Sequence, residues 1–297
     1  MEGTSGGRSP WHRRGRVAPR RTTHSGDPMP RRLLMCRPDH YDVVYEINPW
    51  MSVERTPDTS RAWDQWHALH DALSQLPGVA VELIPQVRGC PDMVFTANAG
   101  LVRGAKAVLA RFRHPERGVE EPHYRSWLEG QGLEVVEPPL GMSFEGEGDA
   151  LFAGGALVTG YYQRSDARAS AFLTDELGCL TLSLCLVDAR WYHLDTCFLP
   201  LGGGVVAYYP GAMDGYAERV IERNFEAIRV PEDDAARFAC NAVVIDRHVV
   251  MPAGCDETAA TLEGRGYSVV CVDTSEFIKA GGSCKCLTLH LDHPPMA

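Results

Sequence analysis

A cysteine near the end of the 297-residue chain has neighbours suited to nucleophilic chemistry. Cys286 follows Lys285 in a loop that begins with Gly281 and Gly282, and it leads into an apolar, strand-like run. Glycines let a backbone approach a ligand closely, and a neighbouring cation lowers the pKa of a thiol. The pattern fits a nucleophilic thiol, and a buried cysteine at the start of a strand fits it equally well. Cys284 is interpreted as a packed neighbour, with redox modulation of Cys286 as the alternative.

A histidine and an aspartate stand two residues apart where the chain enters an apolar hairpin. On an extended strand, His193 and Asp195 face the same side. An imidazole beside a carboxylate has the arrangement of an oriented general acid/base. A hydrogen-bonded histidine of the core produces the same pattern, so both interpretations stay open.

Polar residues also interrupt a third apolar segment, Cys90–Asn98. If this segment is extended, Asp92, Thr96 and Asn98 line one face and Phe95 lies on the other. The solvated face of an ordinary strand explains the same pattern.

A fourth segment, Phe144–Asp149, places three acids between glycines: Glu145, Glu147 and Asp149. It can form a surface turn, whereas a calcium loop would require a twelve-residue ligand spacing that is missing here. Together, the four segments supply a thiol, an imidazole and several carboxylates.

These segments lie within a repeating order of elements. Glycine turns join strand-like runs into hairpins at residues 103–104, 154–155 and 202–204. Helical periodicity is found at 60–76 (with a serine cap), 119–131, 165–178, 214–227 and 256–265. A hairpin, a helix and a strand thus recur about every 50 residues, about five times, which favours a radial fold over a doubly wound sheet. The loops of such a fold converge on one end of its axis.

The charge is unevenly distributed along the chain. Residues 1–32 contain eight arginines against Glu2 and Asp27, a net charge of +6, and the whole chain carries −10, so the remainder carries −16. An acidic body does not indicate nucleic-acid binding. Residues 1–30 are expected to be a disordered basic tail. A translated upstream stretch before a start at Met29, a transit segment and a recruitment arm are the three explanations for it, while the missing apolar run excludes a secretory signal.

Other features exclude further classes of protein. No run of eighteen apolar residues exists, so no membrane span is expected, and no glycine-rich phosphate loop indicates a nucleotide site. Ten cysteines without dense clustering favour reduced thiols in the cytoplasm. His67 and His70 could suggest zinc, but no third ligand has the expected spacing, so they are interpreted as surface histidines. Neither a metal nor another cofactor is predicted.

Four segments in order resemble the signature stretches of the guanidine-modifying (amidinotransferase/pentein) superfamily: CPDMVFTANA, FEGEGDALF, YHLDTCFLPL and GGSCKCLTLHL. The resemblance covers residues 32–292 and is strongest to arginine dihydrolases, then to dimethylargininases; MCRPDHYDVVYEINPWM near the start adds to it. It implies an α/β fold, the fivefold pseudosymmetric ββαβ propeller, with residues 31–297 as a single catalytic domain. This agrees with the repeat count.

The resemblance also implies roles for individual residues. Cys286 becomes the nucleophile, His193 the acid/base, Glu145 the carboxylate that grips the guanidinium nitrogens, and Asp195 the acid of a deiminase-like His-x-Asp.

Other residues would bind the two ends of the substrate. Arg117 and Arg164 match the arginines that hold the substrate carboxylate, and Asn48 is a further candidate for the amino-acid end. Asp92 either grips the guanidino group or caps its loop. Asn98 departs from deiminases and dimethylargininases, which carry aspartate there, and follows the dihydrolases.

The amide of Asn98 leads to a specific hypothesis. Because it both donates and accepts hydrogen bonds, it can retain the neutral ureido group of citrulline for a second attack. The predicted reaction is L-arginine + 2 H₂O → L-ornithine + CO₂ + 2 NH₃. Dimethylargininase is the main rival, ahead of deiminase and amidinotransferase. A non-catalytic arginine-binding or ribosome-factor-like propeller is the alternative from another class. The expected partner is arginine or a methylated arginine, with no nucleic acid or membrane, and self-association is left open.

Overall fold

The computed structural model describes Met1 and residues 31–293. The predictions for the basic tail therefore lie outside the described residues. The described chain forms five three-stranded sheets. In four of the sheets, two antiparallel strands are followed along the chain by a helix and then by a third strand, parallel to the second. In the remaining sheet, the last strand of the described chain takes the place of the first of these strands. The predicted fivefold ββαβ arrangement is confirmed.

The first sheet joins the two ends of the described chain. Its order is β15-β1-β2, and β15 pairs antiparallel with β1. Its elements are β1 (Arg31–Cys36), α1 (Thr59–Ser74), β2 (Val79–Ile84) and β15 (Leu289–His290). The four other units run in order along the chain. They are β3 (Gly100–Arg103), β4 (Lys106–Leu109), α3 (Glu121–Gly130) and β5 (Glu134–Val136); β6 (Ala150–Ala153), β7 (Ala156–Tyr161), α4 (Ala169–Leu177) and β8 (Thr181–Cys185); β9 (Phe198–Gly202), β10 (Val205–Tyr208), α5 (Gly215–Asn224) and β11 (Glu226–Arg229); and β12 (Val243–Ile245), β13 (His248–Pro252), α7 (Asp256–Gly264) and β14 (Ser268–Val272).

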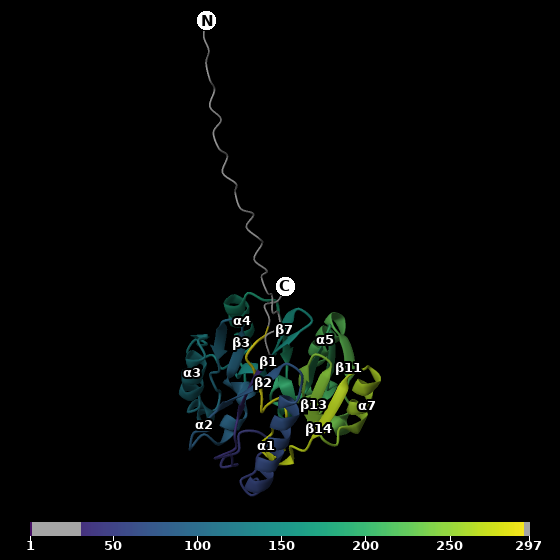
Figure 1. Ribbon diagram of the computed structural model, residues 1–297. Coiled ribbons are helices and arrows are strands. Elements are labelled where there is room, and N and C mark those ends of the chain that lie inside the picture. The colour runs from purple at the N-terminus through teal and green to yellow at the C-terminus, as the bar shows by residue number, and fades with distance from the viewer. Residues whose placement is uncertain (2–30, 294–297) are drawn as a thin grey trace.

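Short helices and 3-10 turns complete the fold. They are α2 (Pro115–Gly118), α6 (Glu232–Ala235), α8 (Ser275–Ile278), η1 (Pro91–Val94), η2 (Thr96–Ala99), η3 (Gly146–Gly148), η4 (Ala189–Trp191), η5 (Leu194–Thr196) and η6 (Pro210–Ala212). The five crossover helices α1, α3, α4, α5 and α7 lie around the outside of the molecule, with the strands inside (Figure 1).

Helix α1 shows how the sequence produces this arrangement. Trp66, Leu69 and Leu73 recur at helical spacing and are fully or almost fully buried. Burying such a side chain contributes about 1.5–3 kcal/mol. The prediction that a serine caps this helix is wrong, because Asp58 is the N-cap and accepts a hydrogen bond from the backbone N–H of Arg61.

The observed elements depart from expectation at several places. The predicted helix over 214–227 is too long, because α5 ends at Asn224 and β11 begins at Glu226. Phe225 between them is extended and nearly buried, so packing of its ring overrides helical continuation. Two further places, Cys90–Asn98 and residues 193–196, belong to the site.

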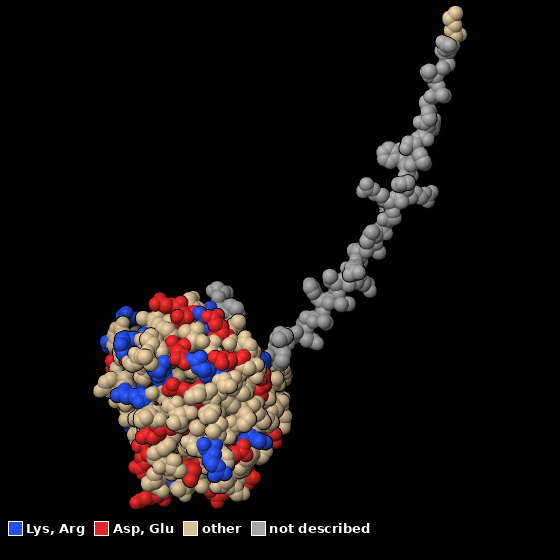
Figure 2. Space-filling model, turned by 90° about the vertical axis from the view of Figure 1, so that its left-hand side faces the viewer, with Lys and Arg blue, Asp and Glu red and all other residues tan. Residues whose placement is uncertain are grey.

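Within the described residues, no helix has the length and apolar character needed to cross a membrane. On the face shown in Figure 2, Lys and Arg side chains are interspersed with Asp and Glu. This face therefore differs from the basic surfaces that bind phosphate backbones.

Candidate active site

The site is built from turns that precede the first strand of each hairpin. Turn η2 precedes β3, η3 precedes β6, and η5 precedes β9. In the chain segments before β12 and β15, residues 238–241 and 284–287 hold the same place. Turn η3 packs against both η2 and η5. The radial fold thus brings residues that are far apart in sequence to one end of its axis, as the repeat predicted.

The prediction that Cys90–Asn98 is an extended strand is wrong. The structure forms η1 and η2 there, and Pro91 at the start of η1 favours a turn because its ring fixes φ. The expected common face is lost. The hydroxyl of Thr96 donates to the carbonyls of Leu34 and Leu287, at 2.9 and 3.0 Å, and the amide of Asn98 faces the catalytic histidine candidate.

Cys286 lies between an amide and a carboxylate. The Nδ2 of Asn241 donates to Sγ at 3.0 Å, and Sγ is 3.2 Å from Oδ2 of Asp195. The Oδ1 of Asn241 accepts from the backbone N–H of both Cys286 and Ser283, at 3.1 Å each. Burial raises the pKa of the Cys286 thiol well above its ordinary value, and Asp195 adds to the effect. The resting group is therefore a thiol that donates to Asp195.

His193 pairs with a different carboxylate from the one expected. Its Nε2 lies 2.7 Å from Oε2 of Glu145, and its Nδ1 lies 3.5 Å from Nδ2 of Asn98. The expectation that Asp195 shares a strand face with His193 is wrong, because residues 194–196 form turn η5, which directs Asp195 toward Cys286. Glu145, rather than Asp195, orients the imidazole.

Both carboxylate oxygens of Glu145 already accept hydrogen bonds from neighbouring groups. Its Oε2 accepts from Nη1 of Arg164 at 2.9 Å, and its Oε1 accepts from the backbone N–H of Arg113 at 3.1 Å. Burial raises the pKa of Glu145, but Arg164 and His193 outweigh that effect and leave its pKa below the ordinary value. Glu145 is a carboxylate that positions His193, and in this structure it does not project a free oxygen for a guanidinium.

The Glu-Gly-Glu-Gly-Asp segment is buried, so it is not the surface turn that the sequence allowed. Gly146 adopts φ +59°, where an added Cβ would meet the backbone of η2. A Cβ on Gly148 would collide with the amide of Asn98. The two glycines let η3 pack directly on η2. Asp149 accepts from Ser165 and from the backbone N–H of Leu194, and burial raises its pKa to about 6.

The two predicted substrate-carboxylate arginines both reach the site. Arg117 forms a two-bond pair with Glu120, at 3.0 and 2.8 Å, and donates to Oδ1 of Asn98 at 2.6 Å. Arg164 pairs with Glu145 and donates to the backbone oxygen of Ile47 at 3.0 Å.

Asp92 and Asn48 differ in how their polar atoms are used. Oδ2 of Asp92 accepts from the hydroxyl of Tyr45 at 3.0 Å, while Oδ1 is buried without a partner, and burial raises the pKa of this carboxyl. Asn48 donates to the carbonyl of Ala280 and accepts from the backbone N–H of Trp50, so both ends of its amide are engaged.

The sequence did not single out Asn241, Glu120 or Tyr45. Asn241 had a signal: it stands two residues before β12, as Asn98 stands two residues before β3. Aligning the repeats would have found it. Within residues 31–293, Glu147, His290 and His293 form a possible metal-ligand group that includes neither Cys286 nor His193.

The sequence profile of the eukaryotic N,N-dimethylarginine dimethylhydrolase family matches residues 48–292. The chain belongs to this family. The resemblance to guanidine-modifying enzymes predicted from four motifs is thereby confirmed.

Relatives of this dimethylarginine dimethylhydrolase family member are of two kinds. A bifunctional arginine dihydrolase/ornithine cyclodeaminase, AgrE of Nostoc sp., is 46% identical over 89% of this chain. A dimethylarginine dimethylaminohydrolase of Mycobacterium tuberculosis is 42% identical over 90% of this chain and 87% of its own length. The chain spans 38% of the length of AgrE.

A crystal structure of the N-terminal domain of ArgZ, an arginine dihydrolase, superposes with a TM-score of 0.87 at 44% identity. The match covers 90% of this chain and all of that domain. The part of the chain that holds the site therefore has the same fold as that domain.

Proposed function

We propose that the protein hydrolyses the guanidino group of free L-arginine, with Cys286 as nucleophile and His193 as proton shuttle, and that it proceeds to L-ornithine. One observation carries the proposal. Asp195, whose Oδ2 contacts the buried thiol, and Asp92, whose Oδ2 accepts from Tyr45, each keep the other carboxylate oxygen, Oδ1, buried without a hydrogen-bond partner. A buried, unpaired carboxylate oxygen is costly, and a guanidinium is a planar cation with several donors that can pair with such oxygens.

Substrate charge activates the thiol in this proposal. Burial and Asp195 keep Cys286 protonated at rest, and burial raises the pKa of Asp195 itself to about 7. A guanidinium beside both groups favours their charged forms. The thiolate then attacks the guanidino carbon, which is held above the sulfur.

His193 transfers the protons. Because Nε2 is paired with Glu145, Nδ1 is the atom left to face the reaction side, next to Asn98. It protonates the departing ammonia and afterwards takes a proton from the water that cleaves the sulfur–carbon bond. The first round leaves citrulline.

Asn98 supports the second round. Its Oδ1 accepts from Arg117, and among the described residues its Nδ2 forms no hydrogen bond other than the 3.5 Å contact with His193, so one amide N–H is available for the ureido oxygen. A second attack by Cys286 expels ornithine and leaves a carbamoyl group on sulfur. Water converts this group to carbon dioxide and ammonia.

Substrate entry requires part of the chain to move. Cys286, His193 and Glu145 are at most 1% exposed. Residues 37–58 form no helix or strand and lie against the site, where Tyr45 bonds to Asp92 and the Ile47 carbonyl bonds to Arg164. This segment is the route we propose because it belongs to no helix or sheet; opening it breaks the hydrogen bonds of Tyr45, Ile47, Asn48 and Trp50 to the rest of the molecule.

The comparisons support this function. Crystal structures of the ArgZ N-terminal domain contain product, a covalent reaction intermediate, and substrate in a cysteine-to-serine variant. We propose further that residues 31–297 form one catalytic domain. The ten cysteines, all unpaired, support a reducing compartment such as the cytoplasm.

Dimethylargininase is the second candidate. It is favoured by the family profile and by the 42% identity to the mycobacterial dimethylaminohydrolase, most of whose length this chain covers.

Product analysis separates the candidates. The purified full chain is incubated with L-arginine or with asymmetric dimethylarginine, and amino acids, ammonia and dimethylamine are quantified. Ornithine with two ammonia per arginine supports the dihydrolase, while citrulline with dimethylamine supports the rival. No turnover of either compound sinks the proposal.

Replacing the amide tests the second round directly. Asn98→Asp places a charged acceptor where the ureido oxygen must bind, so the main product from arginine is expected to change from ornithine to citrulline. Unchanged ornithine formation by this variant contradicts the role of Asn98.

A further inference from the structure

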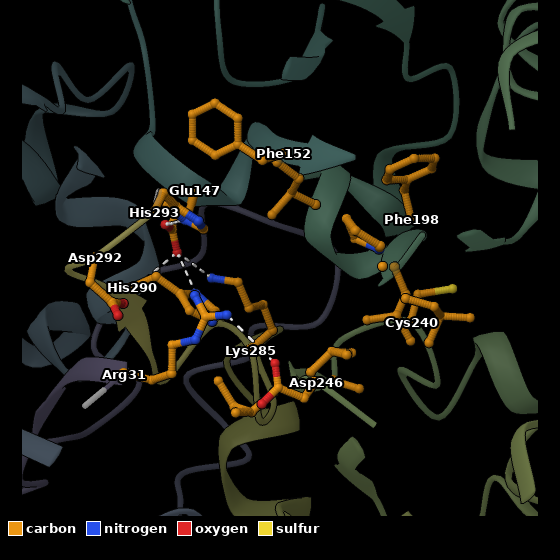
Figure 3. Close-up of a pocket in the computed structure, with 18 residues that line it drawn as sticks. Arg31, Glu147, Phe152, Phe198, Cys240, Asp246, Lys285, His290, Asp292 and His293 are labelled. Atoms are coloured by element: carbon orange, nitrogen blue, oxygen red, sulfur yellow. Dashed lines mark hydrogen bonds and ion pairs between the residues drawn. The ribbon is translucent and has the colours of Figure 1, made fainter. Parts of the chain in front are cut away.

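A second polar cluster lies outside the reaction site. Glu147, Lys285, His290 and His293 line a cavity of about 330 Å³ whose walls include neither Cys286 nor His193. Their side chains point toward one another in Figure 3. The proposed hydrolysis uses none of them.

The two oxygens of Glu147 have different surroundings. Oε2 accepts from Nζ of Lys285 at 2.7 Å and from the backbone N–H of His290 at 3.1 Å, and Nδ1 of His290 lies 3.3 Å away. Oε1 is contacted by Nε2 of His293 at 2.5 Å. Glu147 is buried, whereas the side chains of His290 and His293 are 15% and 21% exposed. An ion can therefore reach the imidazoles from solvent.

The three ligand atoms converge as a metal site requires. One nitrogen of each histidine and a carboxylate oxygen all lie within 4.8 Å of one another. Two imidazoles with one carboxylate form the ligand set of several zinc and non-haem iron sites. To bind one ion at bond lengths of about 2 Å, the side chains must move closer together wherever their ligand atoms are as far apart as this limit allows.

Lys285 is compatible with an ion in this position. It is bonded to Oε2, so an ion bound to Oε1 leaves that bond intact, and ligating carboxylates are commonly held by an outer donor in this way. Asp246 and Asp292 also line the cavity, and together with Glu147 they outnumber the cations Arg31 and Lys285. A divalent cation thus enters surroundings with an excess of negative charge.

We propose that Glu147, His290 and His293 bind a divalent transition metal of the zinc class, with the remaining coordination positions open to cavity water. The bound ion replaces the hydrogen bonds that now join the histidines to Glu147. It lies behind the reaction site, because Lys285 adjoins Cys286 and Glu147 follows Glu145 by two residues.

Calorimetry with Zn²⁺ and absorption spectra with Co²⁺ test the site. The chelator-treated full chain is expected to bind one equivalent, and its Co²⁺ complex is expected to show ligand-field bands without sulfur-to-cobalt charge transfer. The ten cysteines make this distinction necessary. Charge transfer at the first equivalent, or no binding, overturns the proposal.

A pair of double variants identifies the ligands. His290→Gln with His293→Gln is expected to weaken metal binding at least about a hundredfold. This exceeds the effect of losing a residue that only hydrogen-bonds to a metal ligand. The matched control removes two exposed histidines, His67→Gln with His123→Gln, and is expected to bind like wild type. Equal affinity of the two double variants, with circular dichroism confirming that both fold, contradicts the assignment.

Discussion

Asn98 and Asn241 occupy the same place in two repeats, two residues before the first strand of a hairpin. Their hydrogen bonds differ. The side-chain amide of Asn241 forms all four hydrogen bonds open to it. It donates to Cys286 Sγ and to the Asp195 carbonyl, and it accepts from the backbone N–H of Ser283 and Cys286. Asn98 accepts from Arg117, and its N–H groups have only the long contact with His193.

Under the proposed function, the difference separates a positioning residue, Asn241, from a ligand-binding one, Asn98. A fully satisfied buried amide fixes its neighbours, here the turn that presents the thiol. An amide with a free donor is prepared for a partner that arrives later. The same contrast distinguishes Glu145, whose oxygens are all engaged, from Asp92 and Asp195, which each keep a free oxygen.

The largest effect is expected at the thiol itself. Cys286→Ser is expected to reduce arginine turnover at least about 10⁴-fold, because a hydroxyl in this buried site is a far weaker nucleophile. Cys284→Ser, two residues away and equally buried, is the matched control and is expected to retain turnover. If both variants lose activity while remaining folded, the turn has a structural rather than a chemical role. Steady-state ammonia release measures both.

A smaller loss is expected when the imidazole loses its carboxylate. Glu145→Gln keeps the shape but removes the charge that holds Nε2 of His193, and turnover is expected to fall about 10²–10⁴-fold. The acid limb of the pH–rate profile should shift, which a merely structural change would not produce. The exposed Glu129→Gln serves as control, and an unaltered profile in Glu145→Gln argues against the pairing.

Alanine at the two asparagines tests the comparison directly. Asn241→Ala leaves two backbone N–H groups of the thiol turn without an acceptor, which costs about 1–3 kcal/mol of unfolding free energy. Displacement of the thiol is expected to reduce kcat about 10²-fold with little change in KM. Asn98→Ala is expected to change KM and the product ratio instead. Identical effects of the two variants would refute the distinction.

The pH dependence of stability tests the free carboxylate. Burial raises the pKa of Asp195 from 3.8 to about 7, so between these pH values the folded protein retains a proton that the unfolded chain loses. The contribution of Asp195 to the unfolding free energy is therefore fully present below about pH 4 and is lost as the pH rises toward 7. Asp195→Asn removes the decline, so its unfolding free energy relative to wild type should rise by about 2–4 kcal/mol from pH 4 to pH 8.

Denaturant titrations at several pH values measure this difference. The control is Asp64→Asn, at an exposed position of α1. The difference in unfolding free energy between this variant and wild type is expected to stay constant with pH. If the difference in unfolding free energy between Asp195→Asn and wild type is also constant with pH, the pKa of the Asp195 carboxyl is not raised.

The fold could be predicted because each repeat carries its own local signals. Glycine turns, alternating strands and amphipathic helices recur in register, and they agree with the five sheets. The error at β11 arose because Glu226–Arg229 is too short for a strand pattern and follows a helix without a break. Its identity depends on parallel pairing with β10, which is a tertiary contact.

The site could be predicted by residue type but not by pairing. Cys286, His193 and the acids were found because polar groups interrupt apolar runs. Their partners were not, because 3-10 turns replace strands at the axis, and Glu145 meets His193 across 48 residues. The rule that alternate residues of a strand face the same side cannot predict such a contact. The long-range fold alone decides which carboxylate meets which base.

Strand β15 has a consequence for how the protein is made. It pairs with β1, so the last described strand closes the ring onto the first, directly after Cys286. A ribosome-bound chain that has not yet released this strand contains four of the five sheets in full, yet it has no thiol at the axis. Of the five described sheets, the one that Cys286 precedes is therefore the last whose strands have all been synthesised.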